Sequence, residues 1–491
     1  MNTNFVAPRI LKLNVPKVAT KLIKFRKAKD RKIMTLSSNW LPLFGFYGDA
    51  QVVEEMIAPG KGYRIRLANE SDTKTKKVYL REYKSRSANP LKKDAKRVEQ
   101  LVETAGQKLI RESMGDATHA HITFEYGVLT FTPVNNAEWA LLQDLSHDDK
   151  INTLVAMTGG VDCAVLERGG YSVKAVVEYR PNERRDTTDY TEMTALSTLA
   201  NCAPKVLCNE DIYTLNMNKL AELLGDTPIT VAHVSLQCDD FTGDGLKSKE
   251  AKEKSIEELS STIDMFIPTL NMLDAVKPPV LVVENVPGFM GTKDKPNPIN
   301  DVFCLQLRRR GYNIHQQVFN AIDYGGYTTR KRMYMVASTL NSEFAFPEPT
   351  GQKPFSVWAD VIVPNMAEIM QRDITENKVT KDALTSGRAA IISKTRPFSP
   401  TMMKAQGQST KDALMIEIDG RYYRPSTNVL KQLNSLPDSF DAEWLPVDKA
   451  AQVIGQSICC KLHHAIMDSV SKHVRSVGDM FKSGTQMALS L

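Results

Sequence analysis

The 491-residue sequence is poor in cysteine and has no long apolar run. Its seven cysteines are scattered and odd in number, with neither a CxxC pair nor the Cys/His spacing of a zinc finger, which argues against a disulfide framework or a structural zinc site. A reducing compartment is therefore expected. No uncharged segment approaches the roughly 18–20 apolar residues of a membrane helix, and none follows the N-terminus as in a secretory signal. We expect a soluble protein with no membrane partner.

Positive charge is concentrated at one end of the chain. The sequence has 63 Lys+Arg and 57 Asp+Glu, a net charge of +6. Residues 1–35 carry ten basic residues and one acid, Asp30, whereas residues 36–150 have 16 of each. Three interpretations of the basic segment are open: a solvated tail, an organelle-type leader, or an arm that binds phosphates. We expect a flexible basic arm over residues 1–35.

Residues 36–150 predict a small α+β domain of unknown role. Alternating patterns predict a strand over Tyr63–Leu67 and a hairpin over residues 122–132. Apolar residues at helical spacing predict a helix over Asp94–Ser113. His119 and His121 share one strand face and could ligate a metal, but an ordinary polar face is the simpler interpretation because no third ligand is in view.

From residue 151 onward, strands alternate with helices, a pattern that predicts a parallel, doubly wound sheet. The expected strands are residues 154–157, 173–177, 229–236, 280–283 and 334–337, and the expected helices include residues 162–168 and 256–276. With 42% hydrophobic residues, a chain of this length supports roughly two to four domains.

Polar residues suited to chemistry follow several of these strands. Thr158-Gly159-Gly160 is a turn that would let a nucleotide-like ligand approach a helix N-terminus, and Glu178, at the end of the next strand, could bind ribose hydroxyls. A structural turn with a solvated Glu is the competing interpretation. The first turn also lacks its GxG part, because Met157 stands where the earlier glycine would be.

Three further segments carry candidate catalytic groups. Ser235-Leu-Gln-Cys238-Asp-Asp places a thiol at a strand end, where it is either a nucleophile or a buried core cysteine. Glu284-Asn285 ends another strand, and a carboxylic acid with a raised pKa there could donate a proton. Arg330-Lys-Arg332 places two arginines on one face entering a strand, or else forms an exposed basic edge.

The order of these segments is more specific than any one of them. Seven segments follow one another along the chain: the Gly-Gly turn, the strand-end Glu, Asn209-Glu-Asp211-Ile212, the cysteine segment, Glu-Asn-Val, the arginine pair and Gly455-Gln-Ser457. This order resembles the DNA cytosine-5 methyltransferase family over about residues 151–475. The segments Phe344–Thr350 and 421–440 are also similar to runs in that family.

The resemblance implies an α/β fold: a Rossmann-like, doubly wound sheet that binds S-adenosyl-L-methionine (AdoMet), with a small inserted target-recognition domain and the N-terminal α+β unit in front. The expected divisions are a basic arm (1–35), an N-terminal domain (36–150), a catalytic domain (151–350), a target-recognition region (351–411) and a C-terminal part that returns to the catalytic domain (412–491).

The resemblance also implies roles for particular residues. The catalytic residues would be Cys238, Glu284, Asn285, Arg330 and Arg332. AdoMet would be bound by Gly159, Gly160, Val161, Glu178, Tyr179, Asp211, Ile212 and Ser457. Thr401 would contact the DNA backbone, and no metal is expected.

In this scheme the Cys238 thiolate adds to carbon 6 of a cytosine that has left the base stack, while Glu284 protonates ring nitrogen 3. Arg332 would bind the cytosine carbonyl. The expected partner is duplex DNA, and the expected protein is a cytoplasmic, nucleoid-associated monomer of bacterial or phage origin; a restriction partner is left open.

The sequence departs from the family pattern near the nucleophile. The usual Pro-Cys-Gln is Gln237-Cys238-Asp239 here, and the two carboxylates of Asp239 and Asp240 would raise the pKa of the thiol. Gln456 replaces the usual Asn. Three alternatives to a DNA methyltransferase remain: a catalytically impaired DNA-binding relative, a tRNA cytosine-5 methyltransferase, and a nicotinamide dehydrogenase, in which nothing explains Cys238 or Glu284-Asn285.

Overall fold

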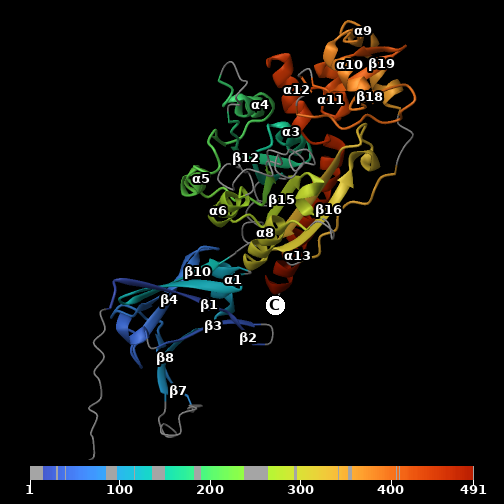
Figure 1. The fold of residues 1–491 in the computed structure, drawn as a ribbon. Coiled ribbons are helices and arrows are strands. Elements are labelled where there is room, and N and C mark those ends of the chain that lie inside the picture. The colour runs from blue at the N-terminus through green and yellow to red at the C-terminus, as the bar shows by residue number, and fades with distance from the viewer. Residues whose placement is uncertain are drawn as a thin grey trace, which may run out of the picture. The chain divides into compact units, whose positions relative to one another are not determined.

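The computed structural model forms two compact units, unit 1 (residues 1–139) and unit 2 (residues 140–491) (Figure 1). The description that follows covers residues 15–28, 31–38, 40–83, 97–115, 117–134, 150–181, 189–236, 264–291, 296–340, 342–351, 356–404, 406–407 and 410–489.

Unit 1 is built from antiparallel strands and one short helix. A six-stranded sheet has the order β1-β9-β10-β5-β4-β6, and a four-stranded sheet has the order β2-β3-β8-β7. The elements are β1 (Val18–Lys24), β2 (Arg26–Ala28), β3 (Arg31–Ser38), η1 (Leu41–Phe44), β4 (Gln51–Ala58), β5 (Gly62–Leu67), β6 (Lys76–Lys77), β7 (Tyr79–Tyr83), β8 (Arg97–Thr104), α1 (Gln107–Met114), β9 (His119–Glu125) and β10 (Val128–Val134). The hairpin predicted over residues 122–132 is confirmed as β9–β10, which turns at Tyr126-Gly127.

Two expectations for unit 1 are wrong. The predicted basic arm is not a free segment over residues 18–28 and 31–35, because β1 pairs with β9 and β3 pairs with β8. Its basic side chains alternate with apolar ones such as Met34, which is buried in the core of the unit. Arg97–Thr104 is a strand rather than the start of a helix, and α1 begins only at Gln107.

Unit 2 contains a seven-stranded sheet of order β13-β12-β11-β14-β15-β17-β16. Strands β11 to β15 are parallel, and β17 is antiparallel to both of its neighbours. The strands are β11 (Ile151–Ala156), β12 (Tyr171–Val177), β13 (Val206–Cys208), β14 (Val231–Ser235), β15 (Val280–Asn285), β16 (Asn313–Asn320) and β17 (Lys331–Ser338). The predicted parallel sheet is confirmed, and β16, which is polar and lacks alternation, was not predicted.

Helices cover both faces of this sheet. They are α3 (Val161–Arg168), α4 (Met193–Asn201), α5 (Met217–Leu224), α6 (Phe266–Val276), α7 (Pro287–Met290), α8 (Pro298–Arg309), η5 (Ala321–Tyr324) and the long α13 (Cys460–Leu489). The part of the predicted 256–276 helix before residue 264 lies outside the described residues.

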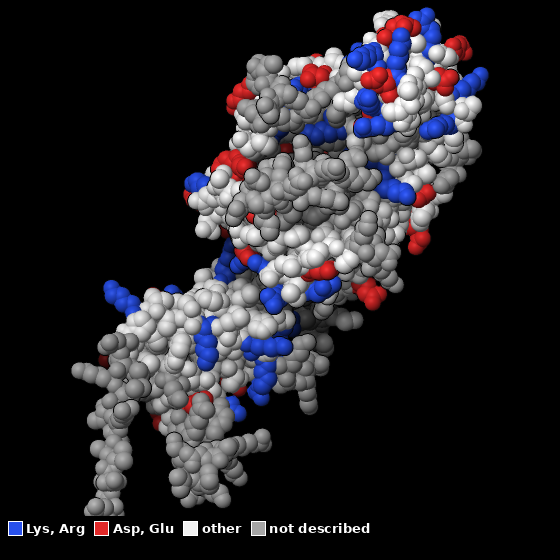
Figure 2. Space-filling view, viewed as in Figure 1, with Lys and Arg blue, Asp and Glu red and all other residues white. Residues whose placement is uncertain are grey.

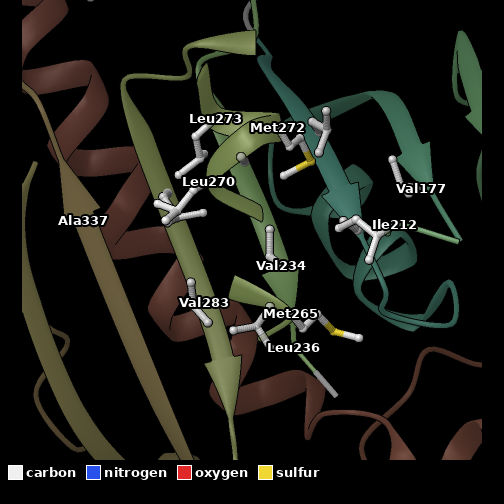
Figure 3. Packing of buried hydrophobic residues seen from close by; sticks show 14 of the residues in the cluster. Val177, Ile212, Val234, Leu236, Met265, Leu270, Met272, Leu273, Val283 and Ala337 are labelled. Atoms are coloured by element: carbon white, nitrogen blue, oxygen red, sulfur yellow. The ribbon is translucent and has the colours of Figure 1, made fainter. Parts of the chain in front are cut away.

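The alternation of side chains along the central strands separates two faces. On one face, Val234 and Val283 pack against α6 residues such as Leu270 in a buried apolar cluster (Figure 3). The opposite face, which carries His233 on β14 and Tyr334 on β17, packs against α3 and α13, as the 2.5 Å hydrogen bond from the Tyr171 hydroxyl to the Met467 carbonyl illustrates. The sheet is therefore apolar on one side and contains buried polar groups on the other.

The remaining part of unit 2 forms a second apolar cluster around a three-stranded sheet, β18-β19-β20. Its elements are η6 (Trp358–Ile362), α9 (Met366–Ile369), α10 (Lys378–Thr385), β18 (Ala390–Ile392), β19 (Leu414–Ile418), β20 (Arg421–Tyr423), α11 (Thr427–Leu433) and α12 (Val447–Gln456). Because β18 pairs with β19, this sheet joins residues on both sides of the expected division at 411.

Figure 2 shows basic and acidic side chains intermixed on the α9–α10 end of unit 2, rather than one uniformly basic face. No helix in the described part of the chain combines the length and the apolar character needed to cross a membrane.

Replacing Leu281 tests the sheet core. Leu281 is fully buried among the cluster on the α6 side, so Leu281→Ala removes packing and leaves a cavity that lowers the free energy of unfolding by about 2–5 kcal/mol. Leu305→Ala on α8 is the matched control, because Leu305 is exposed, and it changes stability by less than about 0.5 kcal/mol. Urea unfolding of both variants measures the difference, and equal effects would contradict the assigned core.

Candidate active site

The topology gathers the predicted functional residues at one edge of the unit 2 sheet. Parallel strands β11, β12, β14 and β15 all end at this edge, and the antiparallel β17 begins there. Ligand and catalytic groups collect at the carboxyl ends of parallel strands. Five segments therefore lie next to one another at this edge: the turn after β11, Glu178 after β12, Leu236 after β14, Glu284-Asn285 at the end of β15 and Arg330 before β17.

The turn after β11 is a tight loop that leads into α3. Gly159 and Gly160 both have positive φ, 69° and 86°, a region that favours glycine. A side chain on Gly160 would also come within 2.8 Å of the Thr198 backbone, so the loop packs directly on α4. Met157, at the position of the missing glycine, also has a positive φ of 61°. Met157 thus adopts a backbone conformation that favours glycine.

Glu178 is buried beneath this loop. Its Oε1 atom accepts hydrogen bonds from the backbone N–H groups of Thr158 and Gly159, both at 2.8 Å, and from the Thr158 hydroxyl at 3.2 Å. Burial raises the pKa of Glu178 to about 7, and these hydrogen bonds oppose the rise. Only one carboxylate oxygen is used in these contacts, so Oε2 is the atom that could bind a ligand hydroxyl.

The other predicted cofactor residues occupy different environments. Tyr179 is half-buried directly after Glu178, and Asp211 is half-buried with its Oδ1 accepting from the Tyr213 N–H. Ile212 is buried in the apolar cluster with Val177 (Figure 3). Asp211 thus has a polar group near the strand ends, whereas the Ile212 side chain belongs to the core.

Glu284 and Arg332 form a largely buried ion pair. The Nε atom of Arg332 lies 2.8 Å from Oε1 of Glu284, and the two side chains are 13% and 11% exposed. Glu284 is the register partner of Ser235 on β14, on one side, and of Tyr334 on β17, on the other. The pair therefore stands between the strand that leads toward Cys238 and the strand that carries the arginines.

Asn285 ties the end of β15 to the segment before the predicted nucleophile. Its Nδ2 atom donates to the Leu236 carbonyl at 3.2 Å, and its Oδ1 atom accepts from the Val286 N–H at 2.7 Å. Leu236 is the last described residue before Cys238, and Cys238 with its flanking residues lies outside the described part of the chain. Asn285 thus fixes the backbone two residues before the thiol.

The side chain of Arg330 is buried and binds backbone carbonyl groups of three other residues. Its guanidinium donates to the carbonyls of Met402 at 3.1 Å, Gly455 at 3.2 Å and Gln456 at 3.0 Å. These contacts bring together the start of β17, the segment after half-buried Thr401 and the end of α12. Gly455 is required at this junction, because a side chain there would come within 2.3 Å of the Met403 carbonyl.

Ser457 is also buried at this junction, and a residue that the sequence did not single out holds it. The Nδ2 atom of Asn434 donates to the Ser457 hydroxyl at 3.1 Å and to the Ile454 carbonyl at 2.8 Å. Gly159 approaches the same region, since a side chain on it would meet the Gln456 amide at 3.8 Å. The first and last predicted cofactor segments therefore adjoin. The only sequence signal for Asn434 was its place just before the Leu436–Phe440 run.

Among the described residues, one group of three side chains has ligand atoms close enough to hold a metal: Asp162, His233 and His463, whose ligand atoms lie within 4.8 Å of one another. All three are buried. His119 and His121 of unit 1 do not belong to this group.

Comparison with known proteins shows which family and which relatives this chain is similar to. Residues 235–472 match the family model of C-5 cytosine-specific DNA methylase. The type II methyltransferase M.SacI of Streptomyces achromogenes is 29% identical over 210 residues, which cover 42% of this chain and 52% of the relative. The type II methyltransferase M.NlaX of Neisseria lactamica is 24% identical over 265 residues, covering 49% and 76%. The chain thus spans about half the length of one relative and three quarters of the other.

Among solved structures, the fold is similar to S. pombe Dnmt2 methyltransferase, with a TM-score of 0.50, 14% identity, and coverage of 65% of this chain and 97% of that one. This likeness confirms the expected Rossmann-like methyltransferase sheet. Residues 235–472 thus match a C-5 cytosine-specific DNA methylase domain, and this match and the type II relatives support the predicted DNA cytosine-5 methyltransferase family.

Proposed function

We propose that the protein transfers a methyl group from AdoMet to carbon 5 of a flipped-out cytosine in duplex DNA. The observation that carries this proposal is the Glu284–Arg332 ion pair at the sheet edge, beside the strand that leads to Cys238. A nearly buried carboxyl group held by a guanidinium is suited to orienting a ring that offers one basic nitrogen and one carbonyl, since the carboxyl group can share a proton with the nitrogen and the guanidinium can donate to the carbonyl. Cytosine presents both groups on its Watson–Crick edge, which becomes accessible when the base leaves the stack.

The chemistry follows from the weak nucleophilicity of carbon 5. The Cys238 thiolate forms a bond to carbon 6, and Glu284 gives a proton to ring nitrogen 3, so that the ring electrons are directed to carbon 5. The group that AdoMet supplies is an electrophilic methyl bound to a sulfonium. When carbon 5 takes this methyl, the donor would leave as a neutral thioether. Loss of the carbon 5 proton to a base then expels the thiolate, and the proton on ring nitrogen 3 returns to Glu284, which restores the neutral ring. Arg332 holds Glu284 through Nε, and we assign its Nη2 to the cytosine carbonyl.

The loop after β11 fits AdoMet in its shape and in its donor set. The positive-φ glycines place no side chain in the loop, and Glu178 fixes the N–H groups of Thr158 and Gly159 through Oε1. Oε2 of Glu178 would accept the ribose hydroxyls, with Tyr179 against the adenine and Asp211 at its amino group. Gly160 and Val161 begin α3, whose N-terminus favours the carboxylate of the methionine part. Ser457 would contact that carboxylate only if its hydrogen bond to the Ile454 carbonyl were exchanged.

The family and the two type II relatives favour duplex DNA over tRNA as the substrate. Thr401 would contact the DNA backbone beside Arg330. A cytoplasmic location on the nucleoid of a bacterial or phage-infected cell follows from this proposal.

Covalent trapping on duplex DNA containing 5-fluorocytosine tests the nucleophile. Fluorine at carbon 5 blocks the final elimination, so wild-type protein with AdoMet is expected to remain attached to DNA, and Cys238→Ala is expected to form no adduct. Cys304→Ala is the matched control, because burial raises the pKa of that thiol and keeps it unreactive. A denaturing gel measures the adduct.

The same trapping assay separates the alternatives. More adduct with 5-fluorocytosine tRNA than with duplex DNA would identify a tRNA methyltransferase. No adduct with either nucleic acid, from a folded protein that still binds DNA, would identify an impaired relative whose thiol is suppressed by Asp239 and Asp240.

Glu284→Gln tests the proton donor. The amide keeps a hydrogen-bond acceptor for Arg332 but cannot transfer a proton, so kcat is expected to fall by about 10²–10⁴-fold while DNA affinity changes little. Glu343→Gln, at an exposed acid of the same unit, should leave kcat unchanged. A kcat within threefold of wild type in the Glu284 variant would remove this residue from the mechanism.

Glu178→Gln tests the buried carboxyl beneath the glycine loop through the pH dependence of stability. The folded-state pKa of about 7 lies above the ordinary value of 4.5, so the unfolded chain loses its proton first as the pH rises. Stability that is fully present below pH 4.5 is therefore lost between pH 4.5 and 7, by about 3 kcal/mol in wild type. The Gln variant does not titrate and lacks this loss.

Urea unfolding at a series of pH values measures the difference between the two proteins, and Glu443→Gln, an exposed site, serves as the control. A constant difference between wild type and Glu178→Gln across pH 4.5–7 would contradict the raised pKa.

A further inference from the structure

A buried polar cluster lies on the α13 side of the unit 2 sheet, outside the residues that the mechanism uses. It consists of Asp162 in the first turn of α3, His233 on β14, Tyr334 on β17 and His463 on α13. None of the four side chains is more than 2% exposed. Four elements that are far apart in sequence thus contribute one polar group each to a single dry site.

The members contact one another in a chain. The Nε2 atom of His233 lies 2.5 Å from Oδ2 of Asp162. The ring of His233 packs against the ring of His463, with centroids 4.8 Å apart, and the Tyr334 hydroxyl lies 3.2 Å from Nδ1 of His463. Burial lowers the pKa of His463 to about 3, so this ring is neutral.

Stability alone does not account for this cluster. The Nδ1 atom of His233 and the Nε2 atom of His463 have no hydrogen-bond partner among the described residues, although both are buried. Each such atom costs roughly 1–3 kcal/mol, and apolar side chains of similar volume would pack at least as well. Unsatisfied buried polar atoms are rare in native proteins, and a functional role is one reason for which they are kept.

Each member stands close to a residue of the proposed active site. Asp162 follows Gly160 by two residues, and His233 precedes Cys238 by five on the strand that leads to it. Tyr334 follows Arg332 by two residues on the same face of β17 and is the register partner of Glu284. The contacts of these four side chains therefore connect the turn after β11 to β14, which leads to Cys238, and β14 to β17, which carries Arg332 of the Glu284–Arg332 pair.

We propose that Asp162, His233, His463 and Tyr334 form a positioning network that sets the cofactor loop and the Glu284–Arg332 pair relative to the strand of Cys238. The proposal rests on the methyltransferase function proposed above. Its two ends act on different steps. The Asp162–His233 end holds the start of α3 and affects the binding of AdoMet, whereas the Tyr334–His463 end holds β17 and affects the chemical step.

Two conservative variants test the two ends separately. Asp162→Asn keeps the shape of the side chain but removes its charge, and the expected result is a rise of about tenfold in the dissociation constant for AdoMet with kcat within threefold of wild type. Tyr334→Phe removes one hydroxyl, and the expected result is a fall of about tenfold in kcat with AdoMet binding within twofold. Displacements of about 1 Å in an active site have effects of this size or larger.

Matched controls make a merely structural effect visible. Glu167→Gln is an acid-to-amide change in the last turn of the same helix α3, and Tyr312→Phe removes another buried hydroxyl of unit 2, one that donates to the Pro278 carbonyl. Both controls should leave AdoMet binding and kcat unchanged. Calorimetry measures AdoMet binding, steady-state kinetics with duplex DNA measure kcat, and the thermal midpoint reports folding.

A combined variant, Asp162→Asn with His233→Gln, completes the test. Since the two residues act through one hydrogen bond, the double variant should weaken AdoMet binding no more than the stronger single variant does. Additive effects, or variants that change the thermal midpoint but neither AdoMet binding nor kcat, would overturn the proposal.

Elemental analysis of the purified protein separates the network from a metal centre. About one divalent metal per chain in wild type, lost in His463→Leu, would show that the three ligand groups hold an ion and would overturn the hydrogen-bonded network. Failure of the proposed function gives a different result, because wild-type protein would then bind AdoMet but methylate no DNA, and the Asp162 variants would still report on the cofactor end.

Discussion

The guanidinium of Arg330 joins the parts of unit 2 on which the active site depends. It is buried, and it donates to three backbone carbonyls from two segments that are 53 residues or more apart in sequence. One planar group with five donors is suited to this task, since an ammonium offers neither the same geometry nor the same reach. Arg330 thus holds together the start of β17, the segment after Thr401 and the end of α12. Because Arg332 is on β17 and Ser457 follows α12, this junction also fixes their positions.

Arg330 and Arg332 have different surroundings in the structure. The sequence placed both arginines at the pocket, and their spacing of two residues predicted a common face. The structure gives them separate tasks: Arg332 pairs with Glu284, whereas Arg330 binds backbone. The backbone conformation explains how the departures are tolerated. Met157 adopts a left-handed conformation, at a cost of roughly 1–2 kcal/mol for a residue with a side chain.

Features that depend on residues close together in the sequence could be predicted, whereas contacts between distant residues could not. Strand ends and turns are local, so Glu284-Asn285 and the glycine loop could be assigned to one edge of a parallel sheet. The Asp162–His233–His463 cluster could not be predicted, because its members are 71 and 230 residues apart and no pattern marks them. The wrong helix over residues 97–104 has a physical cause as well. Its apolar residues fit a helical stripe, but pairing with β3 and β7 decided its conformation.

The packing of α13 against the sheet has a consequence for the order in which the contacts of unit 2 form during synthesis. Tyr171 and His233 complete their contacts only with Met467 and His463, which are among the last 30 residues of the chain. During synthesis, the strands of the sheet leave the ribosome well before their partner helix. The contacts of Tyr171 and His233 with this helix therefore form only after α13 has been synthesised. A chain that ends before α13 would lack the helix residue His463, which contacts His233 and Tyr334 on the buried polar face of the sheet.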